Sequence, residues 1–130
     1  MTDTINVALP GLGRIGHQVA VALANHIEDG GKPIKIVAIA ERDPDSAAAK
    51  RFKDSGVAVF TDAIDVVDLG EKVDIIFDLT GVPSIRQALR VKLQEKSNYH
   101  TVLVPEVFAR LLWSFLEEGV DLSGPLRTGY

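Results

Sequence analysis

The sequence predicts an α/β domain built on a single doubly wound, parallel sheet of about five strands. Short runs rich in valine and isoleucine alternate with longer stretches at helical spacing throughout the 130 residues. Most of the short runs are continuously apolar, which is typical of strands that are buried on both faces. Each connection is long enough for a helix, and such crossovers are right-handed and place helices on both faces of the sheet.

The five expected strands are residues 5–9, 34–40, 57–60, 73–79 and 99–104. We expect them to pair in the order 3-2-1-4-5. The first helix is expected over residues 14–28, where two glycines follow. Asp43 before Pro44 and the pair Thr61–Asp62 are typical helix starts. Pro83 and Pro105 similarly precede helices expected over residues 85–96 and 107–118.

Composition limits the possible classes of protein. With 46% apolar and 25% charged residues the chain resembles an ordinary globular domain, expected over residues 1–119, with an irregular tail at 120–130. A net charge of -4 argues against a nucleic-acid partner. The absence of cysteine excludes thiolate metal sites and cysteine nucleophiles and is compatible with a reducing cytoplasm. No apolar stretch is long enough to span a membrane and no secretory signal opens the chain, so we expect a cytoplasmic location.

The turn after the first strand reads Gly11-Leu12-Gly13-Arg14-Ile15-Gly16. In this G-x-G-x-x-G pattern Gly11 permits a tight turn, Gly13 leaves room for a diphosphate against the backbone, and Gly16 lets the helix pack closely on the strand. The helix start offers free N–H groups and a positive dipole end to the phosphates. Because the motif follows a strand and opens a helix, it predicts a dinucleotide site. The alternative is that the glycines only shape a tight turn.

Glu41, at the end of the second strand, supplies the second half of this fingerprint. Its carboxylate can accept hydrogen bonds from the hydroxyls of the adenosine ribose and would repel a 2′-phosphate, which favours NAD over NADP. Arg42 leaves NADP open, because a guanidinium can hold a 2′-phosphate. Glu41 could also be a solvated strand end.

Thr80 and Gly81 follow the fourth strand, across the switch point from the glycine turn. Ligands bind in this crevice in open α/β sheets, so both residues could contact the nicotinamide ribose or the diphosphate. A loop that merely leads into a helix is an equally good interpretation. Asp78 lies inside an apolar strand, needs a donor partner, and is expected to cap a neighbouring loop.

Residues 5–16, 36–43 and 74–83 resemble the N-terminal Rossmann domains of several dehydrogenases: the Gfo/Idh/MocA oxidoreductases, homoserine and aspartate dehydrogenases, and dihydrodipicolinate reductase. The segment 13–16 is similar to the glycine turn of that reductase, in which an arginine lies near the phosphates. Residues 99–113 also resemble the end of Rossmann-like modules that open some bacterial sensor histidine kinases. These resemblances imply the fold and a nicotinamide cofactor.

The chain departs from those dehydrogenases where chemistry is concerned. They carry a substrate domain that this sequence does not include, and Val104-Pro105-Glu106 stands where Gfo/Idh/MocA members have a catalytic lysine. The histidines His17, His26 and His100 show no carboxylate partner by spacing. We therefore assign no catalytic residue, leave open whether the chain is an enzyme, and expect no metal site.

The last expected helix is apolar on more than one side. One stripe is expected to pack on the sheet. The second is expected to face a second subunit of a homodimer or another protein partner, a following domain in longer relatives, or the tail of the chain. The first stripe comprises Val107, Phe108, Leu111, Leu112 and Phe115, and the second comprises Ala109, Trp113, Leu116 and Val120.

Three functions are compatible with these observations. The first is an NAD(P)-binding module that senses the cofactor or regulates a partner. The second is the cofactor-binding part of an NAD(P)-dependent oxidoreductase that another chain completes. The third is an interaction scaffold whose nucleotide site is empty.

Overall fold

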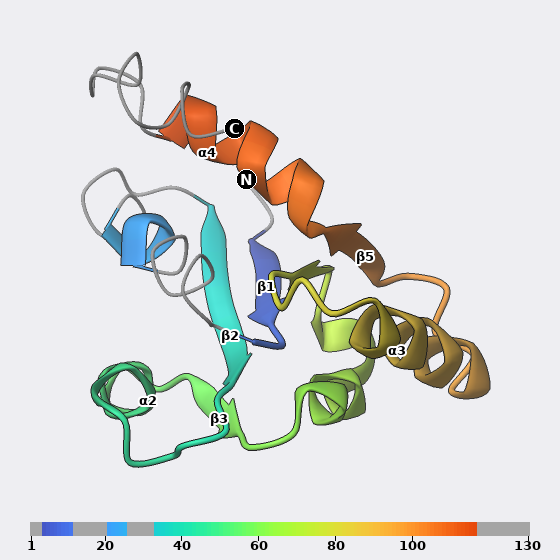
Figure 1. The fold of residues 1–130 in the computed structure, drawn as a ribbon, viewed down its shortest axis with the longest axis horizontal. Helices are drawn as coiled ribbons and strands as arrows, with labels where there is room; N and C mark the ends of the chain where they lie inside the picture. The colour runs from blue at the N-terminus through green and yellow to red at the C-terminus, as the bar shows by residue number, and fades with distance from the viewer. Residues whose placement is uncertain (1–3, 12–20, 26–32, 117–130) are drawn as a thin grey trace.

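The computed structural model describes residues 4–11, 21–25 and 33–116, and contains one five-stranded parallel sheet (Figure 1). The strand order is β3-β2-β1-β4-β5, which confirms the predicted fold class and order. Three strands are shorter than the apolar runs that predicted them. The strands are β1 (Ile5–Leu9), β2 (Ile34–Ala40), β3 (Ala58–Phe60), β4 (Ile75–Asp78) and β5 (Val102–Pro105).

Each face of the sheet carries its own core. On one face, helical residues 21–25 and α2 (Ala47–Asp54) contribute Leu23 and Phe52 to a cluster with side chains of β1, β2 and β4. On the other face, the 3₁₀ segment η1 (Ala63–Lys72) and α3 (Pro83–Glu95) pack on alternate residues of the same strands. Strands covered on both sides explain why their sequences are continuously apolar.

The second helix begins three residues later than predicted. Asp43 accepts a hydrogen bond from the Asp45 N–H (3.0 Å) and so forms a turn with Pro44. The N-cap is Ser46, whose Oγ accepts from the Ala49 N–H at 3.1 Å. The prediction that Asp43 caps this helix is wrong. Asp43 and Ser46 are both good capping residues, and Ser46, which lies closer to the helix, is the one that caps it.

The predicted helix start at Thr61–Asp62 is confirmed. Asp62 caps η1 by accepting from the Ile64 N–H at 3.0 Å, although the segment is 3₁₀ rather than α-helical. Gly70, at φ 66°, interrupts it. Pro83 lies in the first turn of α3, so this helix begins two residues before the predicted residue 85.

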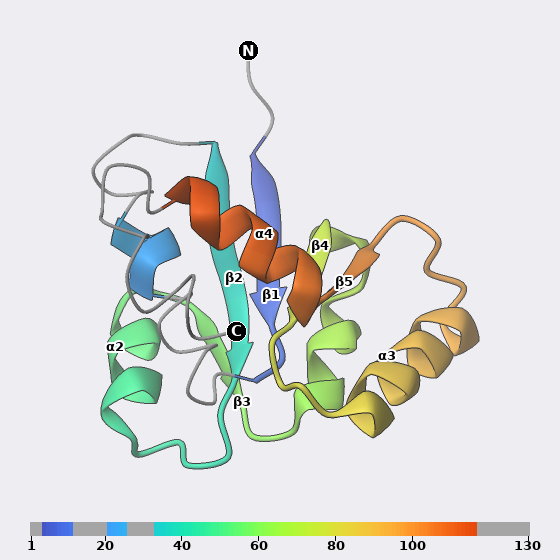
Figure 2. The ribbon, with the colours of Figure 1, turned by 45° about the horizontal axis from the view of Figure 1, so that its top comes forward.

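The prediction for the fifth strand needs a correction. The fifth strand begins at Val102 rather than Tyr99, because the Asn98 side chain accepts from the N–H groups of His100 and Thr101 and holds them in a turn. The helix α4 (Glu106–Leu116) lies next to β4 and β5 and runs obliquely to the strands (Figure 2).

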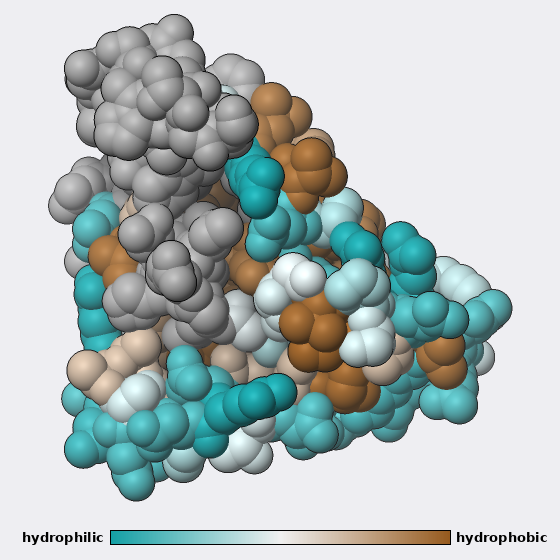
Figure 3. Space-filling model, viewed as in Figure 1, coloured by the Kyte–Doolittle hydropathy of each residue, from teal (hydrophilic) through white to brown (hydrophobic). Residues whose placement is uncertain are grey.

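The stripe of α4 that was expected to pack on the sheet is in part exposed. Val107, Phe108 and Leu111 are 71%, 43% and 52% exposed, so their predicted burial is wrong, and Figure 3 shows apolar surface over α4. A helical spacing shows which residues share a face but not which face meets the sheet. The side chains of Ala109, Leu112, Trp113, Phe115 and Leu116, like residues 117–130, lie outside the described part.

Candidate functional site

The carboxyl ends of the strands bring most of the described candidate residues to one edge of the sheet. Gly11 follows β1, Glu41 and Arg42 follow β2, and Thr80 and Gly81 follow β4. The strand β1 pairs with β2 on one side and with β4 on the other. The strand order therefore extends from β1 in both directions, and the connections on its two sides diverge at this edge. This is the switch point at which ligands bind in open α/β sheets. Residues 12–16, with Gly13 and Gly16, lie outside the described residues, as do His17 and His26.

Gly11 and Thr80 bring the turns after β1 and β4 into direct contact. A Cβ atom built on Gly11 would overlap Cγ2 of Thr80 and lie 3.5 Å from its Cβ. No side chain fits at position 11 unless the Thr80 side chain rotates away from its bond to Asp78 or the Thr80 turn moves. Glycine is therefore required here by the close approach of two turns, a reason additional to the tight turn that the sequence indicated.

Asp78 fixes the position of Thr80. This carboxylate is 2% exposed, and its Oδ1 accepts from the Thr80 N–H (3.1 Å) and the Thr80 hydroxyl (2.6 Å). The Thr80 Oγ1 in turn accepts from the Val82 N–H at 3.1 Å. The expectation that Asp78 caps a loop is confirmed, and its buried carboxyl group has the donors it needs.

Gly81 connects this turn with the start of α4. It has φ 70°, a conformation that favours glycine. A Cβ atom there would lie 3.3 Å from Oε2 of Glu106, the first residue of α4. The other oxygen of Glu106, Oε1, accepts from Nη2 of Arg110 at 2.9 Å. Sequence reasoning gave Glu106 no role, and only its place directly after a strand could have suggested one.

A cavity of about 380 Å³ opens beside Glu41. Its volume is near the lower end of the roughly 300–1,000 Å³ usual for small-molecule sites. The half-buried Glu41 donates its N–H to the carbonyl of Phe60 at 2.8 Å and so continues the pairing of β2 with β3. This bond fixes the backbone from which the Glu41 side chain extends. The cavity is lined by Ala40, Glu41, Arg42, Thr61, Asp62, Ala63, Ile64 and Ile85.

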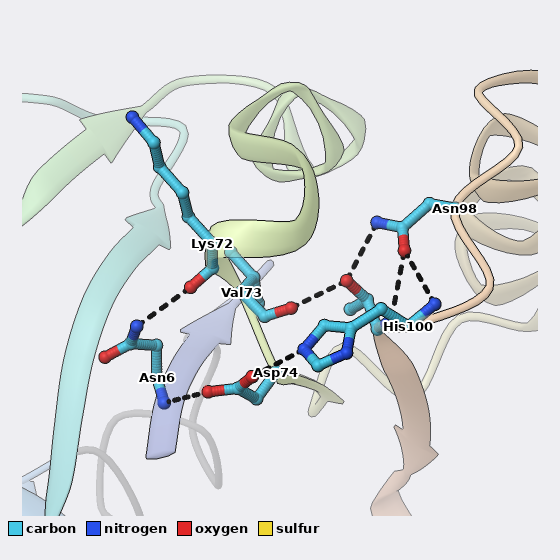
Figure 4. Close-up of polar contacts among 7 residues, drawn as sticks. Asn6, Lys72, Val73, Asp74, Asn98 and His100 are labelled. Carbon is cyan, nitrogen blue, oxygen red and sulfur yellow. Dashed lines mark hydrogen bonds and ion pairs between the residues drawn. The ribbon is translucent and has the colours of Figure 1, made fainter. Parts of the chain in front are cut away.

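The opposite edge of the sheet holds a polar network that the sequence did not predict (Figure 4). His100 Nε2 lies 2.6 Å from Oδ1 of Asp74, which corrects the expectation that this histidine lacks a carboxylate partner. Oδ2 of Asp74 accepts from the Asn6 N–H at 2.8 Å. The Asn6 N–H first, and then His100, lower the pKa of Asp74 below its ordinary value. Asn98 and Thr101 complete this amino-edge network.

Within the described part of the chain, no group of three or more histidine, cysteine or acidic side chains could hold a metal ion. Among the same residues, no helix combines the length and apolar character needed to cross a bilayer.

Comparisons with known proteins support the fold of this chain. Residues 11–111 match the family described as "Homoserine dehydrogenase, NAD binding domain". Two structures of S. aureus homoserine dehydrogenase, at pH 8.5 and pH 6.5, are similar in fold, with TM-scores of 0.59 and 0.58 and sequence identities of 21% and 23%. The aligned region covers 92% and 90% of this chain but only 31% and 30% of theirs. No curated protein matches the sequence significantly.

Proposed function

This chain belongs to the family of homoserine dehydrogenase NAD-binding domains, which are nicotinamide-dinucleotide-binding Rossmann modules, and we propose that it binds NAD in preference to NADP and acts as a cofactor-sensing or regulatory module. The observation that carries the proposal is the arrangement at the carboxyl edge. A cavity beside Glu41 and the contact between Gly11 and Thr80 lie where such sheets bind dinucleotides.

Each part of the dinucleotide has a place along this edge. The turn from Gly11 to Gly16 would receive the diphosphate, with Leu12, Gly13, Arg14 and Ile15 supplying backbone and one cationic side chain. Glu41 would accept from the adenosine ribose, with the adenine in the adjoining cavity. Thr80 and Gly81 would then flank the nicotinamide half. When bound, the cofactor can accept or donate a hydride, whereas these residues bind and orient it.

A sensing role is supported by the contacts that lead away from the crevice. Thr80 packs on Gly11, the Glu106 carboxylate approaches the turn at Gly81, and Glu106 opens α4. A ligand that displaces the Thr80 turn would therefore act on α4, whose exposed residues include Val107 and Leu111. We propose that a partner or a second copy of the chain reads this change through α4, including Trp113 and Leu116.

Calorimetric titration with NAD⁺, NADH, NADP⁺ and NADPH tests the proposal directly. We expect binding of NAD(H), and its loss in Gly13→Asp, because a carboxylate would occupy the position of the diphosphate. The exposed α3 variant Gln94→Glu serves as a control that also adds one negative charge, at the end of the helix away from the crevice. Absence of binding by the unaltered chain would exclude this function.

The choice between NAD and NADP rests on Glu41 and Arg42. We expect Glu41→Gln to lower the ratio of NAD to NADP affinity, since it removes the charge that repels the 2′-phosphate. Arg42→Gln should leave the affinity for NAD nearly unchanged and distinguish any contribution of the guanidinium to NADP binding. A chain that binds NADP more tightly than NAD would contradict the preference.

The family assignment also favours a second function: the cofactor-binding part of an NAD(P)-dependent oxidoreductase, completed by residues on another chain. Hydride transfer needs a closed pocket over the nicotinamide, which a partner would have to provide. Oxidation of homoserine or a related substrate by the purified chain, measured by NADH absorbance, would favour this function over sensing alone.

A further inference from the structure

Glu106 lies beside the Gly81 turn, which the proposed function assigns to the nicotinamide half of the cofactor. In the register of β4 and β5, Asp78 is opposite Pro105, so the turn after β4 and the first residue of α4 leave the sheet side by side. The Glu106 side chain reaches that turn, where its Oε2 approaches Gly81. Because residue 81 is glycine, no side chain separates the Glu106 carboxylate from the backbone of this turn.

Arg110 holds this carboxylate in a defined orientation. Its Nη2 donates to Oε1 of Glu106 at 2.9 Å, one helical turn along α4. The Arg110 side chain is 52% exposed and that of Glu106 only 23%, so the cation lies on the solvent side of the pair. One oxygen of Glu106 is thus occupied by Arg110, while Oε2 faces the Gly81 turn.

The two redox forms of the cofactor differ at the end of the site near Glu106. If Glu41 and the cavity take the adenosine and the glycine turn takes the diphosphate, the other nucleotide extends over β4 and β5. The oxidised nicotinamide ring carries a positive charge, and the dihydronicotinamide ring is neutral. A carboxylate that faces this part of the crevice attracts only the oxidised ring.

We propose that Glu106 makes the site selective for the oxidised cofactor, NAD⁺, over NADH, and that Arg110 limits this selectivity by partly neutralising the carboxylate. This inference rests on the proposed function and makes the module report the oxidation state of its cofactor. Because the pair is partly solvated, the expected contribution of Glu106 is about threefold to tenfold in relative affinity.

The test compares dissociation constants for NAD⁺ and NADH, measured by calorimetry on the whole chain. Glu106→Gln keeps an acceptor for Arg110 but removes the charge, so the preference for NAD⁺ should fall by about threefold to tenfold. Arg110→Met should raise the preference for NAD⁺, because it removes the cation that partly neutralises Glu106. Glu95→Gln, at the exposed end of α3, removes a charge away from the crevice and should leave the preference unchanged.

The outcomes separate the two proposals. A chain that binds both forms, with a preference for NAD⁺ that Glu106→Gln leaves intact, would overturn the role of Glu106 while retaining the proposed function. Equal affinities of the unaltered chain for NAD⁺ and NADH would do the same. A chain that binds no dinucleotide would overturn both. The inference would be supported if Glu106→Gln lowers and Arg110→Met raises the preference for NAD⁺, while thermal unfolding shows that both variants are folded.

Discussion

Asp74 directly precedes β4 and Asp78 is its last residue, and the two carboxylates have different kinds of hydrogen-bond partner. At the amino edge, Asp74 accepts from the backbone of β1 and from His100, so it joins three neighbouring segments directly. At the carboxyl edge, the donors to Asp78 among the described residues are the N–H and the hydroxyl of Thr80, within its own loop. The amino edge is therefore closed by hydrogen bonds across strands, whereas at the carboxyl edge adjacent loops meet through glycines.

This difference indicates which edge can accept a ligand. A network whose polar groups satisfy one another offers few donors or acceptors to a ligand. Loops that meet through Gly11 and Gly81 keep the backbone accessible, and the cavity lies at this same edge. Substitutions at the amino edge should change stability alone, whereas those at the carboxyl edge should change stability and nucleotide binding together.

The largest effect is expected for Gly11→Ala. The added methyl group would overlap Thr80 Cγ2, and overpacking of this kind costs about 1–3 kcal/mol of unfolding free energy. We also expect at least a tenfold loss of NAD affinity, because the Thr80 side chain or its turn must move. Urea unfolding and calorimetry measure the two effects.

Thr80→Ser provides the matched rescue. Serine lacks Cγ2 but keeps the hydroxyl that donates to Asp78, so the double variant Gly11→Ala/Thr80→Ser should recover most of the lost stability. Additive effects of the two substitutions would show that the contact between these turns is not what requires glycine.

The second prediction concerns the amino edge. Asp74→Ala removes the acceptor of the Asn6 N–H and the partner of His100, and an unsatisfied buried donor costs about 1–3 kcal/mol. Because Asn6 is half-buried, we expect a value near the lower end. NAD affinity should stay within about twofold. A marked loss of affinity in a folded variant would contradict the separation of the two edges.

A pH series sharpens this result. The pKa of Asp74 is lower in the folded chain than in the unfolded one, chiefly because of the Asn6 N–H and then His100. Its stabilising contribution is therefore present above the unfolded pKa of about 4 and is lost as pH falls through the folded pKa. The stability difference between the natural chain and Asp74→Asn, measured by urea unfolding at pH 7 and pH 3, should shrink at pH 3. A constant difference would contradict this role.

The two edges also differ in how far the sequence predicts them. Continuous apolar runs predicted the strands, because burial on both faces leaves a clear pattern, and the alternation of these runs with helical stretches indicated the doubly wound order. The contact between Gly11 and Thr80 was foreseen only as a shared crevice, since spacing does not reveal how closely two turns approach. The pair formed by Asp74 and His100 depends on strand register across β4 and β5, which single-sequence periodicity does not determine.

The smallest effect is expected for Ser46→Ala in α2, which belongs to neither edge network. The substitution removes the acceptor of the Ala49 N–H and should cost about 0.5–1 kcal/mol of unfolding free energy. Asp43→Ala should cost less, because Asp43 caps only a turn. Neither substitution should alter the ratio of NAD⁺ to NADH affinity. A larger loss for Asp43→Ala would mean that the helix starts where the sequence first suggested, and a change in the affinity ratio would show that α2 is coupled to the crevice.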